Sequence, residues 1–265
     1  MHVAITGASS GIGEALAREF SATGASVSLI ARRKDLLDQI ASSLATPTFV
    51  KSVDLLDCPN AAAWIAEAEA RLGPIDILIN NAGMQIVGPV EETSAEQGEA
   101  VLKLNLLTPL RLTQAVLPGM IRRKRGTLVD IASMAALAPT PGMHHYNAAK
   151  AGFAAASEAL RGELRGTGVH VVTVYPGPIA TAMAQASFEQ YGDSAKWIPT
   201  GTTEKLAQLI RHAVEKKRAR VIYPRVYAVS RHLPALTRFM IDRFTPRLAR
   251  ASDRTGLLEQ KNGTS

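Results

Sequence analysis

The chain has 265 residues, which is enough for one large α/β domain or two small ones with a sizeable core. No apolar run is long enough to cross a membrane, and the single cysteine, Cys58, excludes a framework of intrachain disulfides. The net charge is +7, but few aromatic side chains lie among the basic ones, which argues against a nucleic-acid-binding platform.

Short apolar runs alternate with amphipathic stretches along the chain, and the first run starts so close to Met1 that we expect no signal peptide and a cytoplasmic protein. Seven runs are predicted to be strands: His2–Thr6, Ser26–Ala31, Thr48–Val53, Ile75–Asn80, Gly126–Ile131, Val169–Tyr175 and Ala219–Tyr223. They are rich in Val and Ile, as strands covered on both faces are. Helical patterns between them imply right-handed crossovers. The sequence therefore predicts an α/β fold of the Rossmann type, a doubly wound parallel seven-stranded sheet with helices on both faces.

A glycine-rich turn follows the first strand. Residues Thr6 to Gly13 read T-G-A-S-S-G-I-G, and a helical pattern starts at once after them. Strand, glycine turn and helix together present backbone N–H groups to a phosphate, and the glycines allow the tight turn and the close approach. A glycine-rich stretch can be only a turn, but its place between strand and helix favours a nucleotide site.

The second strand ends in Ile30-Ala31-Arg32-Arg33, without an acidic residue. In this fold an acid at that position binds the adenosine ribose hydroxyls, whereas a guanidinium binds a 2′-phosphate with two hydrogen bonds. The sequence therefore predicts NADPH/NADP+ as cofactor, with Arg32 as the main contact and Arg33 or Lys34 assisting. The alternative is that these side chains are solvated at the start of a helix.

Four polar side chains are candidates for catalysis. Tyr146 and Lys150 are four residues apart, so on a helix they share one face, and a nearby ammonium favours ionisation of a phenol. Ser133 directly follows the fifth strand, and Asn105 lies among leucines in a helical stretch, where it needs hydrogen-bond partners. Considered alone, Tyr146 and Lys150 could be a surface pair on an amphipathic helix, and Asn105 could have a purely structural role.

Taken in order, these motifs resemble the short-chain dehydrogenase/reductase family of the classical, NADPH-preferring type, over about residues 1 to 223. The resemblance rests on the turn at Thr6–Gly13, V-D-L around Asp54, N-N-A-G at Asn80–Gly83, the four polar residues above, and the loop from Pro176 to Thr181. It implies that these contacts hold the cofactor: Gly7, Ser9, Ser10, Gly11, Ile12, Gly13, Arg32, Arg33, Asp54, Leu55, Asn81, Ala82, Gly83, Tyr146, Lys150, Pro176, Gly177, Ile179 and Thr181.

The resemblance also implies an NADP(H)-dependent oxidoreductase that interconverts a carbonyl compound and its alcohol. Tyr146 is then the acid/base and Ser133 donates a hydrogen bond to the substrate oxygen. Lys150 lowers the tyrosine pKa and binds the nicotinamide ribose, and Asn105 holds a water that passes protons. A homodimer or homotetramer, built through helices around residues 98–123 and 146–165, is also implied.

Substrate contacts are expected from three variable pieces, at residues 84–92, 135–145 and 182–203. The principal candidates are Met84, Met134, Met143, Met183, Phe188 and Trp197, of which about half are expected only to pack in the core. Their apolar character predicts a hydrophobic ketone or aldehyde. His144 and His145 have no third ligand at metal spacing, so no metal site is predicted and both are interpreted as surface or substrate-lining residues.

The chain is expected to form a single catalytic domain over residues 1–223, followed by a variable C-terminal extension over 224–265. That extension mixes arginines with apolar residues, and Pro234 and Pro246 divide it. We expect it to pack near the substrate opening; contact with a membrane surface is the less favoured alternative. Two other functions are alternatives. A 3-oxoacyl-thioester reductase shares every motif. A non-catalytic nucleotide-binding regulator shares only the fold and ranks lower, because it would be expected to lack the tyrosine or lysine, whereas Tyr146, Lys150 and Ser133 are all present.

Overall fold

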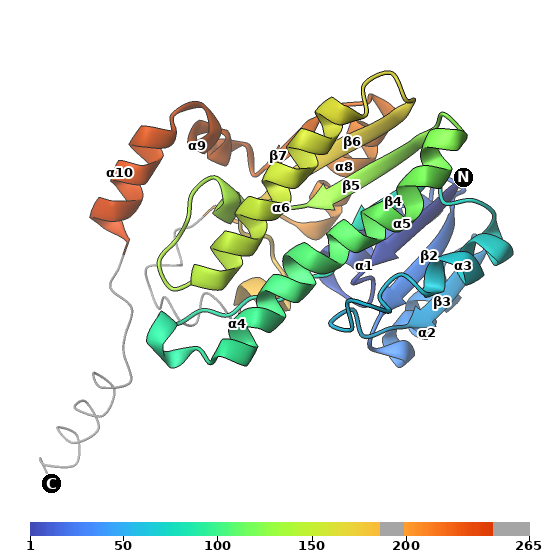
Figure 1. Ribbon diagram of the computed structural model, residues 1–265, viewed down its shortest axis with the longest axis horizontal. Coiled ribbons are helices and arrows are strands. Elements are labelled where there is room, and N and C mark those ends of the chain that lie inside the picture. The colour runs from blue at the N-terminus through green and yellow to red at the C-terminus, as the bar shows by residue number, and fades with distance from the viewer. Residues whose placement is uncertain (186–198, 246–265) are drawn as a thin grey trace, which may run out of the picture.

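The computed structural model describes residues 1–185 and 199–245. Its seven parallel strands lie in the order β3-β2-β1-β4-β5-β6-β7 (Figure 1). They are β1 (His2–Thr6), β2 (Ser26–Ala31), β3 (Thr48–Ser52), β4 (Ile77–Asn80), β5 (Gly126–Ile131), β6 (Val169–Pro176) and β7 (Arg220–Tyr223). From β1 the chain first adds β2 and β3 on one side of the sheet and then β4 to β7 on the other side. The predicted doubly wound parallel sheet is therefore confirmed.

Helices cover both faces of the sheet (Figure 1). The α-helices are α1 (Gly11–Ser21), α2 (Lys34–Ser43), α3 (Trp64–Leu72), α4 (Ala95–Leu102), α5 (Thr108–Arg122), α6 (His144–Glu163), α8 (Thr203–Glu215), α9 (Val229–His232) and α10 (Pro234–Phe244). Shorter turns are η1 (Val90–Glu92), η2 (Lys103–Leu107), η3 (Met134–Ala136) and η5 (Arg225–Ala228).

Two apolar layers sandwich the sheet because successive strand residues point to opposite faces. Ile5 of β1 belongs to the layer that holds Phe20 of α1 and Ile210 of α8. Its neighbour Ala4 belongs to the other layer, with Trp64 of α3 and other side chains from α3 and α5. The carboxyl ends of the strands are thereby fixed at one edge, where the loops carry the polar residues.

Helix α3 begins at Trp64, after an irregular turn. Residues 61–63 form tighter turns in which backbone N–H groups bond to the carbonyl three residues back, as in Ala63 to Asn60 at 3.0 Å. Cys58 holds this turn against the body of the protein, since its sulfur lies 3.2 Å from Thr108 Oγ1 and the side chain is buried. The cysteine therefore has a structural place.

Asn105 interrupts a long helical run. α4 leads directly into the π-helical turn η2, which leads into α5. The widened turn occurs where Asn105 Nδ2 donates to the carbonyl oxygens of Val101 at 2.9 Å and Met84 at 2.8 Å. Single π turns inside α-helices are frequent at functional sites.

The chain after β7 forms η5, α9 and α10, which lie at one end of the molecule (Figure 1). Pro234 begins α10 and separates it from α9, as the sequence indicated; Pro246 lies outside the described residues. No residue of α9 or α10 is buried. Within the described chain no helix combines the length and apolar character needed to cross a bilayer.

Candidate active site

One cavity of about 1070 Å³ lies at the carboxyl edge of the sheet. Strands β1 to β6 each contribute residues at or just beyond their carboxyl ends, where open α/β sheets bind ligands. The cavity brings together most residues singled out in the sequence: Gly7, Ser9, Ser10, Gly11, Ile12, Arg32, Arg33, Asp54, Leu55, Asn81, Ala82, Gly83, Asn105, Ser133, Met134, Met143, Tyr146, Lys150, Pro176, Gly177, Ile179, Thr181 and Met183.

The glycine turn has the conformation that its sequence requires. Gly7 and Gly11 have φ angles of 65° and 58°, a region that side chains with a β-carbon rarely adopt. Gly13 does not line the cavity; a β-carbon there would stand 2.2 Å from the Gly7 carbonyl oxygen. Its function is close packing of helix on turn. The turn therefore leaves the first N–H groups of α1 free to bind an anion at the cavity.

The N-N-A-G motif is tied to this turn through Thr6. The Thr6 hydroxyl accepts hydrogen bonds from the backbone N–H groups of Asn81 and Ala82, each at 3.0 Å. The Asn81 amide in turn donates to the Thr6 carbonyl oxygen at 2.9 Å. These bonds fix the end of β4 beside the glycine turn, so the two motifs form one wall.

The two arginines after β2 have different surroundings. Arg33 donates to Ser9 Oγ at 2.9 Å and Ser10 Oγ at 2.8 Å, so its guanidinium lies across the glycine turn. The exposed Arg32 guanidinium makes no hydrogen bond or ion pair with the described residues. Lys34, expected to assist, forms an ion pair with Asp38 at 2.6 Å and does not line the cavity. The cavity is thus bordered by one anchored and one unpaired guanidinium.

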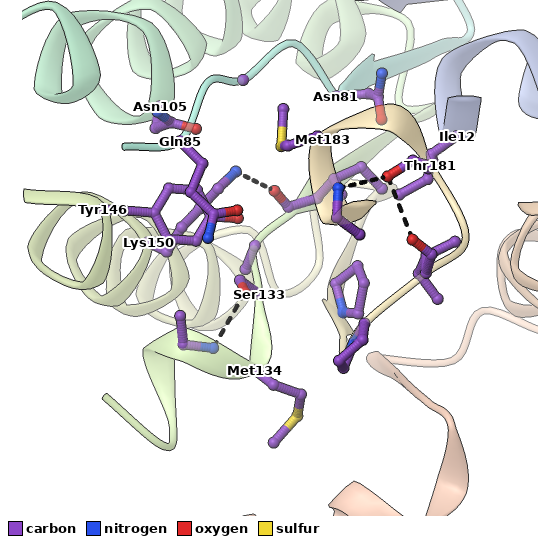
Figure 2. Close-up of a pocket in the computed structure, with 18 of the residues that line it drawn as sticks. Ile12, Asn81, Gln85, Asn105, Ser133, Met134, Tyr146, Lys150, Thr181 and Met183 are labelled. Carbon is purple, nitrogen blue, oxygen red and sulfur yellow. Dashed lines mark hydrogen bonds between the residues drawn. The ribbon is translucent and has the colours of Figure 1, made fainter. Parts of the chain in front are cut away.

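Ser133, Tyr146 and Lys150 meet near the middle of the cavity (Figure 2). Ser133 begins the turn after β5 and accepts a hydrogen bond from the Ala135 N–H at 3.0 Å. Tyr146 and Lys150 occupy successive turns of α6, with the Lys150 ammonium 5.8 Å from the centre of the tyrosine ring. Their common face is the one that the four-residue spacing predicts.

The pKa of Tyr146 differs from the sequence-based expectation. Burial raises the pKa of the phenol above its ordinary value, although the neighbouring Ser133 hydroxyl lowers it. Lys150 was expected to lower it, but the ammonium donates to the Ile131 carbonyl oxygen at 2.8 Å and desolvation of the phenol dominates. Tyr146 is therefore held in its protonated form at neutral pH, which suits a proton donor.

Lys150 shares its buried surroundings with an acid. Burial lowers the pKa of Lys150 to about 8, and the carboxylate of Asp130 acts in the opposite direction. Asp130 is 2% exposed and accepts a hydrogen bond from Asn80 Nδ2 at 2.9 Å. Its own pKa is raised by burial. Sequence reasoning did not single out Asp130, whose signal was an acidic residue inside an otherwise apolar strand.

Asn105 presents a free acceptor beside Gly83. Its amide nitrogen holds two carbonyl groups, whereas Oδ1 is buried with no hydrogen-bond partner among the described residues. A β-carbon on Gly83 would lie 2.7 Å from this oxygen and 3.7 Å from Lys150 Nζ. A buried acceptor of this kind requires a donor such as an ordered water.

The substrate side differs in part from the sequence-based prediction. Met84 does not line the cavity, and its carbonyl group is bound by Asn105. The next residue, Gln85, lines the cavity and contacts the Met143 sulfur at 2.6 Å. Met134 lines the cavity but is 6% exposed and packs in a core cluster. Met183 is 42% exposed. The predictions for Phe188 and Trp197 concern residues outside the described part of the chain.

The C-terminal helices supply a wall that no motif indicated. Tyr227 of η5 and Leu236, Met240 and Ile241 of α10 line the cavity. Two hydrogen bonds connect this segment to the neighbouring loops, from the Tyr227 hydroxyl to the Pro199 carbonyl oxygen at 2.9 Å and from Arg238 to that of Pro139 at 3.3 Å. Their only sequence signal was apolar residues at helical spacing.

The two histidines before Tyr146 lie at the start of α6. His144 is exposed, and His145 packs on α4, where a β-carbon on Gly98 would stand 2.4 Å from its ring nitrogen. Neither lines the cavity. In the described residues there is no cluster of three or more side chains that could ligate a metal ion.

Comparison with known proteins relates this arrangement to one family. The profile of the family described as short chain dehydrogenase matches residues 1–192, which is more than half of the chain. The chain belongs to the short-chain dehydrogenase family. It is therefore an oxidoreductase of a family that binds a nicotinamide cofactor, as the sequence motifs predicted.

Relatives in this family span several organisms. An uncharacterized oxidoreductase of Staphylococcus epidermidis is 34% identical over 192 residues, covering 72% of this chain and 83% of its own. A fatty acyl-CoA reductase of Mycobacterium tuberculosis is 36% identical over 211 residues, which cover 75% of this chain and 72% of the reductase.

Solved structures of short-chain dehydrogenases have the same fold. One from Streptomyces avermitilis superimposes with a TM-score of 0.79 at 29% identity, covering 100% of this chain and 98% of that one. One from Sphingobium yanoikuyae, in complex with NADPH, has a TM-score of 0.77 at 30% identity, covering 96% and 99%. A serine dehydrogenase complexed with NADP+ has a TM-score of 0.76 at 28% identity, covering 84% and 94%.

Proposed function

We propose that this protein is an NADP(H)-dependent reductase that converts a hydrophobic ketone or aldehyde into its alcohol, with Tyr146 as the proton donor. The observation that carries the proposal is the convergence of Ser133, Tyr146 and Lys150 in one cavity whose far end is bordered by Arg32 and Arg33. Reduction is the expected direction because the proposed cofactor is NADPH, and the Tyr146 phenol, whose pKa burial raises, carries the proton that a nascent alkoxide needs.

The residues present fit a nicotinamide dinucleotide phosphate. The free N–H groups at the start of α1 suit the pyrophosphate, and Asp54 at the cavity wall suits the adenine. Lys150 suits the nicotinamide ribose hydroxyls, and the loop from Pro176 to Thr181 suits the nicotinamide end. When bound, the cofactor supplies the hydride.

The protein's own residues have distinct tasks in this scheme. Ser133 donates a hydrogen bond to the substrate oxygen, and Tyr146 delivers the proton to it. Lys150, with a pKa near 8, carries a positive charge at neutral pH and replaces the proton of Tyr146. Asn105 Oδ1 is an acceptor for the water that connects Lys150 with solvent.

The choice of NADPH over NADH rests on charge. Arg32 is exposed and unpaired beside the turn, and Arg33 is already fixed across Ser9 and Ser10. Among the relatives of known structure, one is complexed with NADPH and one with NADP+. We assign recognition of the 2′-phosphate to Arg32, as expected from the sequence, with Arg33 as a second, pre-positioned guanidinium.

The apolar wall formed by Met183, Leu236 and Met240 supports a hydrophobic substrate. A second candidate is a 3-oxoacyl thioester, favoured by the acyl-CoA activity in the name of the M. tuberculosis relative. A panel separates them: alkyl and aryl ketones, aldehydes, 3-oxoacyl thioesters and short polar ketones, each followed by NADPH absorbance. Preference for apolar carbonyl compounds supports the proposal, whereas preference for small polar ketones contradicts it.

We also propose a homodimer or homotetramer, since members of this family commonly oligomerise. Leu107 at the end of η2 and Ile121 of α5 are exposed apolar side chains at 46% and 39%, as expected of a helix that packs on a neighbouring subunit. Light scattering on the purified protein tests this: a dimer or tetramer mass supports it, and a monomer at all concentrations contradicts it.

A further inference from the structure

The segment after β7 exposes an unusual share of the apolar surface. Of the twelve large apolar side chains that are exposed in the described chain, seven lie in this segment. They are Val226, Val229, Leu233, Leu236, Phe239, Met240 and Phe244, and we call residues 226–244 the C-terminal surface. Helix α10 stands at the edge of the molecule (Figure 1), and contiguous exposed apolar patches mark binding surfaces.

Helix α10 is amphipathic. At about 100° per residue, Phe239, Leu236, Met240 and Phe244 fall within an arc of about 140°. Arg238 and Asp242 lie on the opposite side, where they pair with each other. The apolar arc is exposed along its length, with Phe239 at 61% and Phe244 at 62%.

Charge identifies the kind of surface that this helix fits. Residues 224–245 contain four arginines and a single acid, Asp242. Arg231 lies 3.5 Å from Glu158, and Arg238 is paired with Asp242. Arg225 and Arg243 have no carboxylate partner within residues 1–185 and 199–245, and Arg243 lies 5.6 Å from the centre of the Phe244 ring. At about 100° per residue Arg243 falls within the apolar arc, where its long apolar stem can run along the arc while its guanidinium reaches the headgroups, as arginines do in helices that lie in a lipid interface.

We propose that the C-terminal surface docks on the face of an anionic lipid bilayer. The apolar arc of α10 enters the acyl boundary, and Arg225 and Arg243 contact the anionic headgroups. A second copy of this chain is a poorer occupant, because self-association through this surface brings together Arg225 and Arg243 of both copies, which have no carboxylate partner among the described residues.

Docking also places the active-site cavity at the lipid. Leu236 and Met240 belong both to the exposed arc and to the cavity wall. A bilayer in contact with the arc therefore borders the cavity mouth, and an apolar carbonyl compound dissolved in it reaches the site without crossing water. This part of the inference rests on the proposed function; the docking itself does not.

Vesicle co-sedimentation of the full chain tests the docking without any turnover. The probes are phosphatidylcholine vesicles with and without phosphatidylglycerol. We expect binding to the anionic vesicles at least tenfold tighter than to the neutral ones and weaker at high salt, because each arginine near such a surface contributes about fivefold. Equal or no sedimentation with both vesicles overturns the proposal.

Matched variants locate the contact. Phe239→Ser with Phe244→Ser, and separately Arg225→Gln with Arg243→Gln, are expected to weaken vesicle binding at least tenfold. None of these four residues lines the cavity, so turnover of a water-soluble ketone stays unchanged. Arg71→Gln with Arg218→Gln removes two exposed arginines elsewhere on the molecule, outside the proposed subunit contacts, and leaves vesicle binding intact.

Two results contradict this assignment. Vesicle binding that is unchanged in both pairs of C-terminal variants places the contact elsewhere. A dimer in analytical ultracentrifugation that dissociates on Phe239→Ser with Phe244→Ser, together with no vesicle binding, identifies a second copy as the occupant. If the unaltered protein binds anionic vesicles but reduces no ketone, the proposed function is overturned and the docking remains.

Discussion

Gly83 and Asn105 approach so closely that a β-carbon on Gly83 would stand 2.7 Å from Asn105 Oδ1. The asparagine cannot retreat easily, because its amide nitrogen is bonded to the Met84 and Val101 carbonyl groups. The last residue of the N-N-A-G motif is therefore fixed by the π turn of a helix that follows it by about twenty residues. Because Gly83 has no β-carbon, the space between Asn105 Oδ1 and Lys150 Nζ stays open; a β-carbon there would lie 3.7 Å from the lysine nitrogen.

Replacement of Gly83 by alanine tests this relationship. Gly83→Ala is expected to lower kcat about tenfold or more and the free energy of unfolding by about 1–3 kcal/mol, because overpacking displaces the Asn105 amide. Gly162→Ala is the control, since a β-carbon at that position in α6 meets nothing within 4 Å. Steady-state rates and urea unfolding of both variants measure the difference. Equal behaviour of the two variants refutes the packing argument.

Arg32 and Arg33 are expected to differ in their effect on cofactor choice. Arg32→Asp should raise the KM for NADPH about tenfold to a hundredfold and leave that for NADH nearly unchanged, because only NADPH has the 2′-phosphate. Arg33→Gln should weaken both cofactors, because it also releases Ser9 and Ser10 of the phosphate-binding turn. Lys34→Gln, whose side chain pairs with Asp38, is the control. An unchanged preference in Arg32→Asp rules out the assignment.

Asp130 should control the pH dependence of turnover through Lys150. The pKa of Lys150 is about 8, so its positive charge is present below this pH and lost above it. Reduction should accordingly decline as the pH rises through about 8. Asp130→Asn keeps an acceptor for Asn80 but removes the carboxylate that raises the lysine pKa, so the decline should begin at lower pH. The test compares the kcat–pH profiles of the unaltered protein and Asp130→Asn. Coincident profiles would exclude an effect of Asp130 on the titration of Lys150.

Glu158 of α6 should make stability sensitive to acid. It accepts hydrogen bonds from Arg220, Arg161 and the Tyr175 hydroxyl, and although desolvation opposes ionisation, these partners lower its pKa from 4.5 to about 2. A lowered carboxyl pKa stabilises the fold above pH 4.5, and this contribution is lost as the pH falls towards 2. Glu158→Gln should cost about 1 kcal/mol at neutral pH, allowing for partial exposure. Urea unfolding at several pH values should show the free energies of unfolding of the unaltered protein and Glu158→Gln converging in acid. A difference that stays constant with pH contradicts this prediction.

Local sequence rules were enough to predict the fold. Val- and Ile-rich runs separated by helical periods define a parallel sheet, and the strand ends moved by only one or two residues. The four-residue spacing of Tyr146 and Lys150 likewise gave their common helix face, because helix geometry alone determines it.

Features that depend on tertiary packing were not accessible to those rules. Nothing local distinguishes Arg32 from Arg33; the difference arises because the guanidinium of Arg33 reaches Ser9 across the turn. Within the predicted substrate piece 84–92, Gln85 lines the cavity and Met84 does not, which no local pattern indicated. The C-terminal extension was expected near the substrate opening, but the residues of α10 that line the cavity were not named, because apolar residues at helical spacing predict a helix without predicting which side chains face the site.

The central claim is that Tyr146 donates the proton during carbonyl reduction, and Tyr146→Phe tests it most directly. The measurement is NADPH oxidation with the best ketone of the panel, with NADPH binding followed by fluorescence and Tyr223→Phe, outside the cavity, as the control. The predicted result is a fall in kcat of about 10² to 10⁴-fold with NADPH affinity unchanged. Turnover at the wild-type rate in Tyr146→Phe would contradict the mechanism.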